Sequence, residues 1–248
     1  MIQFDFSGQT AVVTGGTRGI GRAISEAFLK SGARVLATFQ GNTEAAGEFQ
    51  QANAEHADRL LVKQCDVTDY DAVEGLFKFI DAELGVIQVL VNNSGIRRDQ
   101  IVGMMVQEEW HAVIDTNLTG TFYMSKFAVQ NMARKRYGRI VNITSPIARF
   151  GMPGQGNYAA SKAGQVAFAA SLSKETARRK ITVNCVSPGF IGTDLIADLP
   201  EERVEMYLNL VPMRRFGEVD EVAHSVLFLA SKEASYITGT VLEVTGGL

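Results

Sequence analysis

The chain has 248 residues, of which 46% are hydrophobic and 21% are charged. This balance is typical of a globular protein with a substantial core and excludes collagen-like and disordered chains. The formal net charge of −3 gives no global electrostatic reason to bind nucleic acid or an anionic membrane, so any anion site must be local. The start, MIQFDFSG, has no basic leader, and no run approaches the roughly 18 apolar residues that span a bilayer, which predicts a cytoplasmic protein.

Short β-branched runs alternate with longer helical stretches along the whole chain. Strands are expected over residues 10–14, 34–38, 60–64, 89–92, 139–143, 182–186 and 241–244, and helices over 19–30, 43–57, 71–84, 119–135, 158–179 and 220–231. Near-continuous apolar strands require a sheet whose two faces are both covered. We therefore expect one α/β domain over residues 1–248, a doubly wound parallel sheet of about seven strands with helices on both faces. The amphipathic stretch near 190–212, which contains Pro200 and Pro212, is expected to form a substrate lid.

A glycine-rich segment, TGGTRGIG at residues 14–21, follows the first expected strand and opens the first expected helix. Glycines there allow a sharp turn, and the helix directs its first N–H groups at a bound pyrophosphate. The spacing G-x-x-x-G-x-G differs from the commoner G-x-G-x-x-G, so a simple tight turn is the alternative reading.

The second expected strand, RVLATFQGN at residues 34–42, indicates which dinucleotide is bound. Enzymes that use NAD usually place an acid at the end of this strand to bind the ribose hydroxyl, but no acid occurs here before Glu44. Arg18 adds a cation in the glycine loop that is suited to a 2′-phosphate, with a solvated surface role as its alternative. NADPH/NADP+ is therefore favoured. Asp66, after the third strand, is expected either to bind adenine or to cap the next helix.

Tyr158 and Lys162 are four residues apart in an expected helix, so both side chains lie on one face. An adjacent ammonium favours the ionised phenol, which predicts a lowered pKa for Tyr158 and a role as general acid toward a carbonyl. Ser145 closes the fifth expected strand, where its hydroxyl can bond a substrate oxygen, with an ordinary turn serine as the alternative. Asn117 lies in an apolar helical stretch and needs partners for its amide, which suggests a kinked helix with a water relay.

Taken in chain order, TGxxxGxG, Asp66, the NNSG at residues 92–95, Asn117, Ser145, the YxxxK of Tyr158 and Lys162, and the PG at residues 188–189 resemble the short-chain dehydrogenase/reductase family. The resemblance covers essentially the whole chain and implies a Rossmann-type fold with NAD(P)-dependent hydride transfer. It implies Tyr158 as proton donor, Ser145 polarising the carbonyl, Lys162 lowering the tyrosine pKa and holding the nicotinamide ribose, and Asn117 supporting a water-mediated proton path. It further implies dinucleotide contacts from Gly15, Thr17, Arg18, Gly19, Ile20, Gly21, Asp66, Val67, Asn93, Gly95, Tyr158, Lys162, Pro188, Gly189, Ile191 and Thr193.

Two residues depart from the family pattern. Ser94 replaces the usual Ala of NNAG, and Thr245 replaces the usual Asp or Asn of the C-terminal motif. The second departure puts the details of C-terminal packing in doubt.

Within this family the chain looks most like the reductases that convert a 3-oxoacyl thioester on acyl carrier protein to the (3R)-3-hydroxyacyl product in fatty acid biosynthesis. That likeness implies a homotetramer and an acidic carrier docking on Arg136 and Arg179 beside the mouth of the site. The alternative for these two arginines is a helix C-terminal capping role. Alternative functions are reduction of acetoacetyl-CoA, a sugar, a polyol or a cyclic ketone, or a non-catalytic NADP-binding regulatory subunit.

Two further groups of residues complete these expectations. His56, His111 and His224 lack metal-ligand spacing, so no metal site is expected. Trp110, in EEWHAVI, is expected to belong to the core.

Overall fold

The computed structural model describes residues 4–193 and 201–248. Its centre is one parallel sheet of seven strands in the order β3-β2-β1-β4-β5-β6-β7, which confirms the expected doubly wound sheet. The strands are β1 Thr10–Val13, β2 Arg34–Phe39, β3 Leu60–Gln64, β4 Val89–Asn92, β5 Gly138–Ile143, β6 Ile181–Pro188 and β7 Val241–Val244. The strand order reverses between β1 and β4, and ligands of such sheets bind beside the carboxyl ends of strands at this point.

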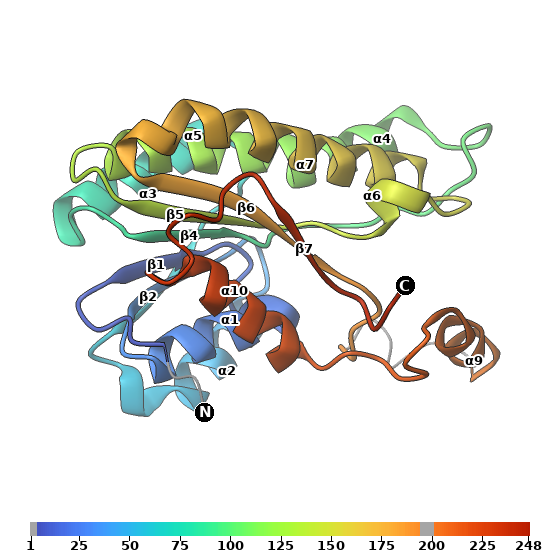
Figure 1. Cartoon of the computed structure of the whole chain (residues 1–248), viewed down its shortest axis with the longest axis horizontal. Helices are drawn as coiled ribbons and strands as arrows, with labels where there is room; N and C mark the ends of the chain where they lie inside the picture. Colours follow the sequence, from blue (N-terminus) through green and yellow to red (C-terminus); the bar gives the residue numbers. More distant parts are fainter. Residues whose placement is uncertain (1–3, 194–200) are drawn as a thin grey trace.

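Helices cover both faces of the sheet (Figure 1). One layer consists of α1 Gly19–Lys30, α2 Thr43–Ala52 and α10 Val219–Ala230, and the other of α3 Tyr70–Glu83, α4 Gln107–Ile114, α5 Gly120–Met132 and α7 Gly156–Thr176. The short α6 Ile147–Phe150 follows β5, and α9 Glu201–Leu210 lies away from the sheet near the C-terminal end of the chain in Figure 1.

The apolar strands supply two cores, one on each face. Ala11 and Val13 pack into the core beneath α1 and α10, whereas Val12 between them packs into the core beneath α3, α5 and α7. In the neighbouring strand β4, Val89 packs into the first of these cores and Leu90 into the second. Because successive side chains point to opposite faces and both faces are covered, burial selects an apolar residue at every position.

The expected helix over residues 119–135 is part of a longer helical segment. It begins with α4, which was not predicted, continues through a π-helical turn at Asp115–Thr119, and ends with α5. Trp110 on α4 is 40% exposed, so its assignment to the core is wrong. The first turn of α4 contains Glu108 and Glu109, and Val113 is its buried residue, so only part of this helix faces the core.

The expected lid over 190–212 is described only in part. Residues 194–200 lie outside the described residues, while α9 forms the second half of the segment. In the part of the chain that the structure describes, no helix has the length and apolar character needed to cross a membrane.

Candidate active site

The expected site residues gather at one edge of the sheet. The glycine loop follows β1, Asn93 and Gly95 follow β4, Ser145 follows β5, and Pro188 ends β6. All four strands are parallel, so these positions share the carboxyl edge of the sheet at and beside the β1–β4 reversal.

The glycine loop has the geometry of an anion site. Gly15 has φ +59°, and a Cβ on Gly21 would lie 2.1 Å from the Gly15 carbonyl oxygen, so neither position accepts a larger residue without a shift. Arg18 occupies the N-cap of α1, makes no side-chain cap, and is followed by a first turn without acids. The first N–H groups of α1 therefore remain available to a phosphate, and the loop fits a dinucleotide.

Two of the expected cofactor residues approach this loop from other strands. A Cβ on Gly19 would lie 3.9 Å from Thr193 Cγ2, which places the segment after β6 opposite the glycine loop. A Cβ on Gly95 would lie 3.3 Å from Asn117 Oδ1 and 3.5 Å from Lys162 Nζ. The structure thus brings the segments after β1, β4 and β6 together with the catalytic helix.

The Asn93 side chain is hydrogen-bonded to the backbone of the glycine loop. Its Nδ2 donates to the carbonyls of Thr14 (2.9 Å) and Gly15 (3.1 Å). The Thr14 hydroxyl in turn accepts from the backbone N–H groups of Asn93 and Ser94, each at 2.9 Å. Thr14 was not predicted as a site residue. Its position directly after β1, the strand that pairs with β4, could have indicated a contact with the end of β4. Its role is to join the two strand ends at which the dinucleotide is expected.

Asp66 does not cap α3, because Asp69 accepts from the first N–H groups of that helix. Asp66 Oδ1 instead accepts from the backbone and hydroxyl of Thr68, and Oδ2 accepts from Gln40 Nε2 at 2.7 Å. Burial raises the pKa of Asp66, but these hydrogen bonds outweigh it and lower the pKa below its ordinary value. The carboxylate beside the end of β2 is thus already bonded by three donors.

The side chains of four other expected cofactor residues are wholly or partly buried. Thr17, Val67 and Ile191 are at most 6% exposed, and Ile20 packs against the core beneath α1. A Cβ on Gly217 would lie 2.7 Å from Ile191 Cδ1, so the Ile191 side chain packs toward that loop. Pro188 ends β6, and the Gly189 N–H donates to the Val244 carbonyl. These positions can offer mainly backbone groups to a ligand.

Tyr158, Lys162 and Ser145 form one cluster. Lys162 lies one helical turn after Tyr158 on α7, with its Nζ 5.6 Å from the centre of the tyrosine ring. The ammonium donates to the Ile143 carbonyl at the end of β5 at 2.7 Å. Ser145, two residues beyond that carbonyl, lies close enough to the phenol to lower its pKa by hydrogen bonding. The structure therefore brings together the three residues for which a catalytic role is predicted on and after β5 and on α7.

The predicted direction of the Tyr158 pKa is wrong. Burial raises it above its ordinary value of 10, although Ser145 and the Arg97 guanidinium act in the opposite direction. Burial also lowers the pKa of Lys162 from 10.5 to about 8, and no carboxylate among the described residues forms an ion pair with it. Desolvation of both groups exceeds the effect of the ammonium on the phenol. A phenol that stays protonated at neutral pH still suits a proton donor.

Asn117 lies in the π-helical turn, and its side chain is fully bonded to protein groups. Its Oδ1 accepts from the Ile96 N–H at 2.9 Å, while Nδ2 donates to the Ile96 carbonyl and to Ser161 Oγ. Its own carbonyl accepts from Thr121 Oγ1 and Gln165 Nε2. The expected break in the helix is present, and the amide fixes the loop after β4 to α7.

Arg136 and Arg179 lie at the opposite edge of the sheet. Arg136 precedes β5 and Arg179 precedes β6, whereas Ser145 and Pro188 follow or end those strands. A strand of six residues spans about 20 Å, so these arginines cannot flank the site of their own chain. Their predicted place beside its mouth is wrong, and the Arg136 guanidinium donates to the Arg178 carbonyl.

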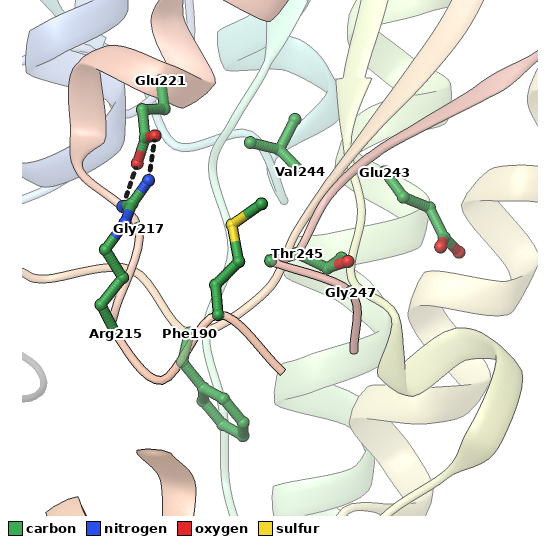
Figure 2. A pocket seen from close by; sticks show the side chains of 10 residues that line it. Phe190, Arg215, Gly217, Glu221, Glu243, Val244, Thr245 and Gly247 are labelled. Carbon is green, nitrogen blue, oxygen red and sulfur yellow. Dashed lines mark hydrogen bonds and ion pairs between the residues drawn. The ribbon is translucent and has the colours of Figure 1, made fainter. Parts of the chain in front are cut away.

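A cavity of about 340 Å³ lies beside the C-terminal segment (Figure 2). Phe190, Thr245 and the Arg215–Glu221 ion pair line it, and neither Tyr158 nor Ser145 does. A Cβ on Gly189 would lie 3.0 Å from Thr245 Cα, so Thr245 packs its backbone against the PG turn. In the described part of the chain, no three His, Cys, Asp or Glu side chains gather as a metal site.

The fold and the site define a class of protein: reductases and dehydrogenases that bind a dinucleotide at the reversal point of a parallel sheet. Residues 15–248 match the family described as Enoyl-(Acyl carrier protein) reductase. The 3-oxoacyl-[acyl-carrier-protein] reductase FabG of Haemophilus influenzae is 46% identical over 241 residues, 97% of this chain and 98% of the relative.

Two more relatives have similar identity. FabG of Escherichia coli is 44% identical over 246 residues, 98% of each chain. The acetoacetyl-CoA reductase of Shinella zoogloeoides is 44% identical over 241 residues, 96% of this chain and 98% of the relative. The chain belongs to the short-chain dehydrogenase/reductase family.

Lys162→Met tests the cost of the buried ammonium. The pKa of Lys162 is lower in the folded protein, about 8, than the ordinary 10.5, so burial of its charge destabilises the folded state. This penalty has its full size below pH 8 and disappears as the pH rises from about 8 toward 10.5. The stability of Lys162→Met relative to the wild type is therefore expected to fall by about 2 kcal/mol between pH 7 and pH 9.5, as measured by urea unfolding. A relative stability that is constant or rises with pH over this range contradicts the buried, easily deprotonated lysine.

Proposed function

We propose that the protein reduces a 3-oxoacyl thioester, bound to acyl carrier protein, to the (3R)-3-hydroxyacyl thioester with NADPH in fatty acid biosynthesis. The assembled Tyr158–Lys162–Ser145 cluster carries this proposal. The relatives named as 3-oxoacyl-[acyl-carrier-protein] reductases support the substrate class. Reduction of acetoacetyl-CoA is the second candidate, because a relative of that name is 44% identical over nearly the whole chain.

The cluster polarises a ketone oxygen and protonates it. The Ser145 hydroxyl lies within hydrogen-bonding reach of the Tyr158 hydroxyl, so a carbonyl oxygen bound at this edge can accept from both. The raised pKa of Tyr158 keeps its proton available until the oxygen becomes basic. Lys162, fixed to the Ile143 carbonyl, presents its remaining N–H groups to the ribose side of the site. NADPH, when bound, supplies the hydride to C3 of the substrate.

The proposed preference for NADPH rests on the charged residues expected near the adenosine end of the bound dinucleotide. Arg18 is exposed at the N-cap of α1, and in the described residues it is paired with no carboxylate. β2 ends in Thr38 and Phe39, and Gln40 follows it, so no acid stands at the end of this strand. The Asp66 carboxylate is engaged by Thr68 and Gln40 and is therefore not free to bind a ribose hydroxyl as the acid of an NAD site does. Arg18 is the cation proposed to bind a 2′-phosphate.

The remaining expectations are part of the same proposal. The protein is expected to be cytoplasmic and homotetrameric, with one domain and a substrate lid near 190–212. The acidic carrier is expected to dock on Arg136 and Arg179. Since these arginines lie at the far edge of their own sheet, a carrier docked on them would have to serve the site of another subunit of the homotetramer.

Tyr158→Phe removes the proton donor and leaves the ring that packs beside Lys162. We expect kcat for reduction of acetoacetyl-carrier protein to fall by about 100-fold or more, with the melting temperature nearly unchanged. NADPH oxidation at saturating substrate measures the effect. Turnover within twofold of the wild type is inconsistent with the assigned role.

Arg18→Gln removes the cation proposed to bind the 2′-phosphate. A charge-assisted hydrogen bond of typical strength predicts that the ratio of kcat/KM for NADPH to that for NADH falls by about tenfold. Arg22→Gln, one turn further along α1 and paired with Glu26, is the matched control. A wild-type enzyme that prefers NADH overturns the cofactor assignment.

Charge reversal at both Arg136 and Arg179 tests carrier docking. If the carrier binds there, kcat/KM for acetoacetyl-carrier protein falls by about tenfold while that for acetoacetyl-CoA changes less than twofold. Reversal at Arg134 and Arg178, exposed neighbours on the same two turns, is the control. An equal change in kcat/KM for both substrates on reversal of Arg136 and Arg179, relative to the wild type, rejects the docking site.

A further inference from the structure

A fully buried glutamine, Gln165, stands on α7 three residues after Lys162, which is about one helical turn. Its Nε2 donates to the Asn117 carbonyl at 2.8 Å and to Thr121 Oγ1 at 2.7 Å. Its Oε1 is buried and has no hydrogen-bond partner among the described residues. A buried amide that is satisfied on one side only costs stability, so packing alone favours an apolar residue of similar size at this position. The two hydrogen bonds of Nε2 therefore need an explanation in function.

These hydrogen bonds help to close the main-chain carbonyl of Asn117. Thr121 Oγ1 donates to the same oxygen at 2.7 Å, so two side-chain donors occupy the two lone pairs of this carbonyl. The side-chain amide of Asn117 is held as well, by Ile96 and by Ser161 Oγ. The protein thus already bonds the groups of Asn117 at which a water-mediated proton path was expected to begin.

The π-helical turn that carries Asn117 lies directly beside the ammonium of Lys162. A Cβ on Gly95 would lie 3.3 Å from Asn117 Oδ1 and 3.5 Å from Lys162 Nζ, so both groups face the same glycine. Ser161, which accepts from Asn117 Nδ2 at 3.0 Å, donates to the Tyr158 carbonyl at 2.8 Å. A displacement of this turn would therefore reach both the ammonium and the part of α7 that carries the phenol.

We propose that Gln165 is a positioning residue for ketone reduction, because it locks the π-helical turn of Asn117 to α7 and fills the carbonyl that a water relay would need. Asn117 then serves as a fixed link between the loop after β4 and α7. The proton that Tyr158 gives to the ketone oxygen is replaced without a water bonded to the Asn117 carbonyl. The proposal rests on the proposed function, in which Tyr158 is the proton donor.

Gln165→Met removes both donated hydrogen bonds and keeps an unbranched side chain of similar length in the buried space. We expect kcat for the reduction of acetoacetyl-CoA to fall by about tenfold while KM for this substrate changes less than twofold, because the reacting groups are misplaced and no group that contacts the ketone is removed. Hydrogen exchange of the backbone amides of residues 115–121 is expected to become about tenfold faster.

Thr176→Val is the matched control on the same helix. Thr176 is also buried, and its hydroxyl bonds the carbonyls of Leu172 and Ile181. The variant loses buried hydrogen bonds of α7 at a place remote from Asn117. We expect it to leave both kcat and the hydrogen exchange of residues 115–121 unchanged, whatever it does to the melting temperature.

Thr121→Val removes the other side-chain donor to the Asn117 carbonyl with little change in shape, and it gives the same two readouts if Gln165→Met does not fold. Because both side chains act through one carbonyl oxygen, the double variant is expected to lose no more kcat than the more damaged single variant. A loss in the double variant that equals the product of the two single losses contradicts this shared route.

An unchanged or raised kcat in Gln165→Met overturns the proposal, because a freed Asn117 carbonyl then either has no effect or opens a relay. Unchanged hydrogen exchange of residues 115–121 overturns it too, since Gln165 then does not hold the turn. An equal loss of kcat in Thr176→Val has the same consequence. A wild type that reduces no ketone defeats the proposed function instead, and the exchange measurement still decides whether Gln165 locks the turn.

Discussion

The proposed chemistry depends on the desolvation of a partly buried phenol and a buried ammonium at the carboxyl edge of a parallel sheet. Desolvation disfavours the charged form of each, so Tyr158 keeps its proton to high pH and Lys162 loses its proton easily, with a pKa of about 8. A surface Tyr–Lys pair at the same helical spacing is solvated and keeps ordinary pKa values. Burial, rather than spacing alone, therefore keeps the phenol of this common helical pair protonated, as its proposed role of proton donor requires.

The rest of the structure keeps these two groups in place. The Lys162 ammonium is fixed by the carbonyl that ends β5, and the helix that carries it is joined through Ser161 and Gln165 to the π-helical turn of Asn117. Asn117 in turn fixes the loop after β4, and Asn93 and Thr14 join β4 to the glycine loop. Hydrogen bonds and the short chain segment 93–96 thus link the expected dinucleotide site to α7, the helix that carries Tyr158 and Lys162.

Much of the fold and of the site follows from the sequence. Runs such as Ala11 to Val13 predict a doubly covered strand, and the glycine loop and the i,i+4 pair predict where a dinucleotide and a proton donor lie. The direction of the Tyr158 pKa was not predictable, because it depends on how deeply neighbouring elements bury the phenol. The place of Arg136 was available from topology, since a residue that precedes a parallel strand lies at the edge opposite one that follows it. The role of Thr14 depends on contacts with Asn93 and Ser94, which lie about 80 residues further along the chain, so the order of the strands and not the local sequence indicates it.

The most direct measurement is the titration of Lys162 by NMR, with lysine labelled at Cε and the signal assigned by its loss in Lys162→Met. We expect a midpoint at a pH of about 8 in the protein without added dinucleotide. A midpoint near the ordinary 10.5 contradicts it, because it shows an ammonium exposed to solvent and a catalytic pair that burial does not control.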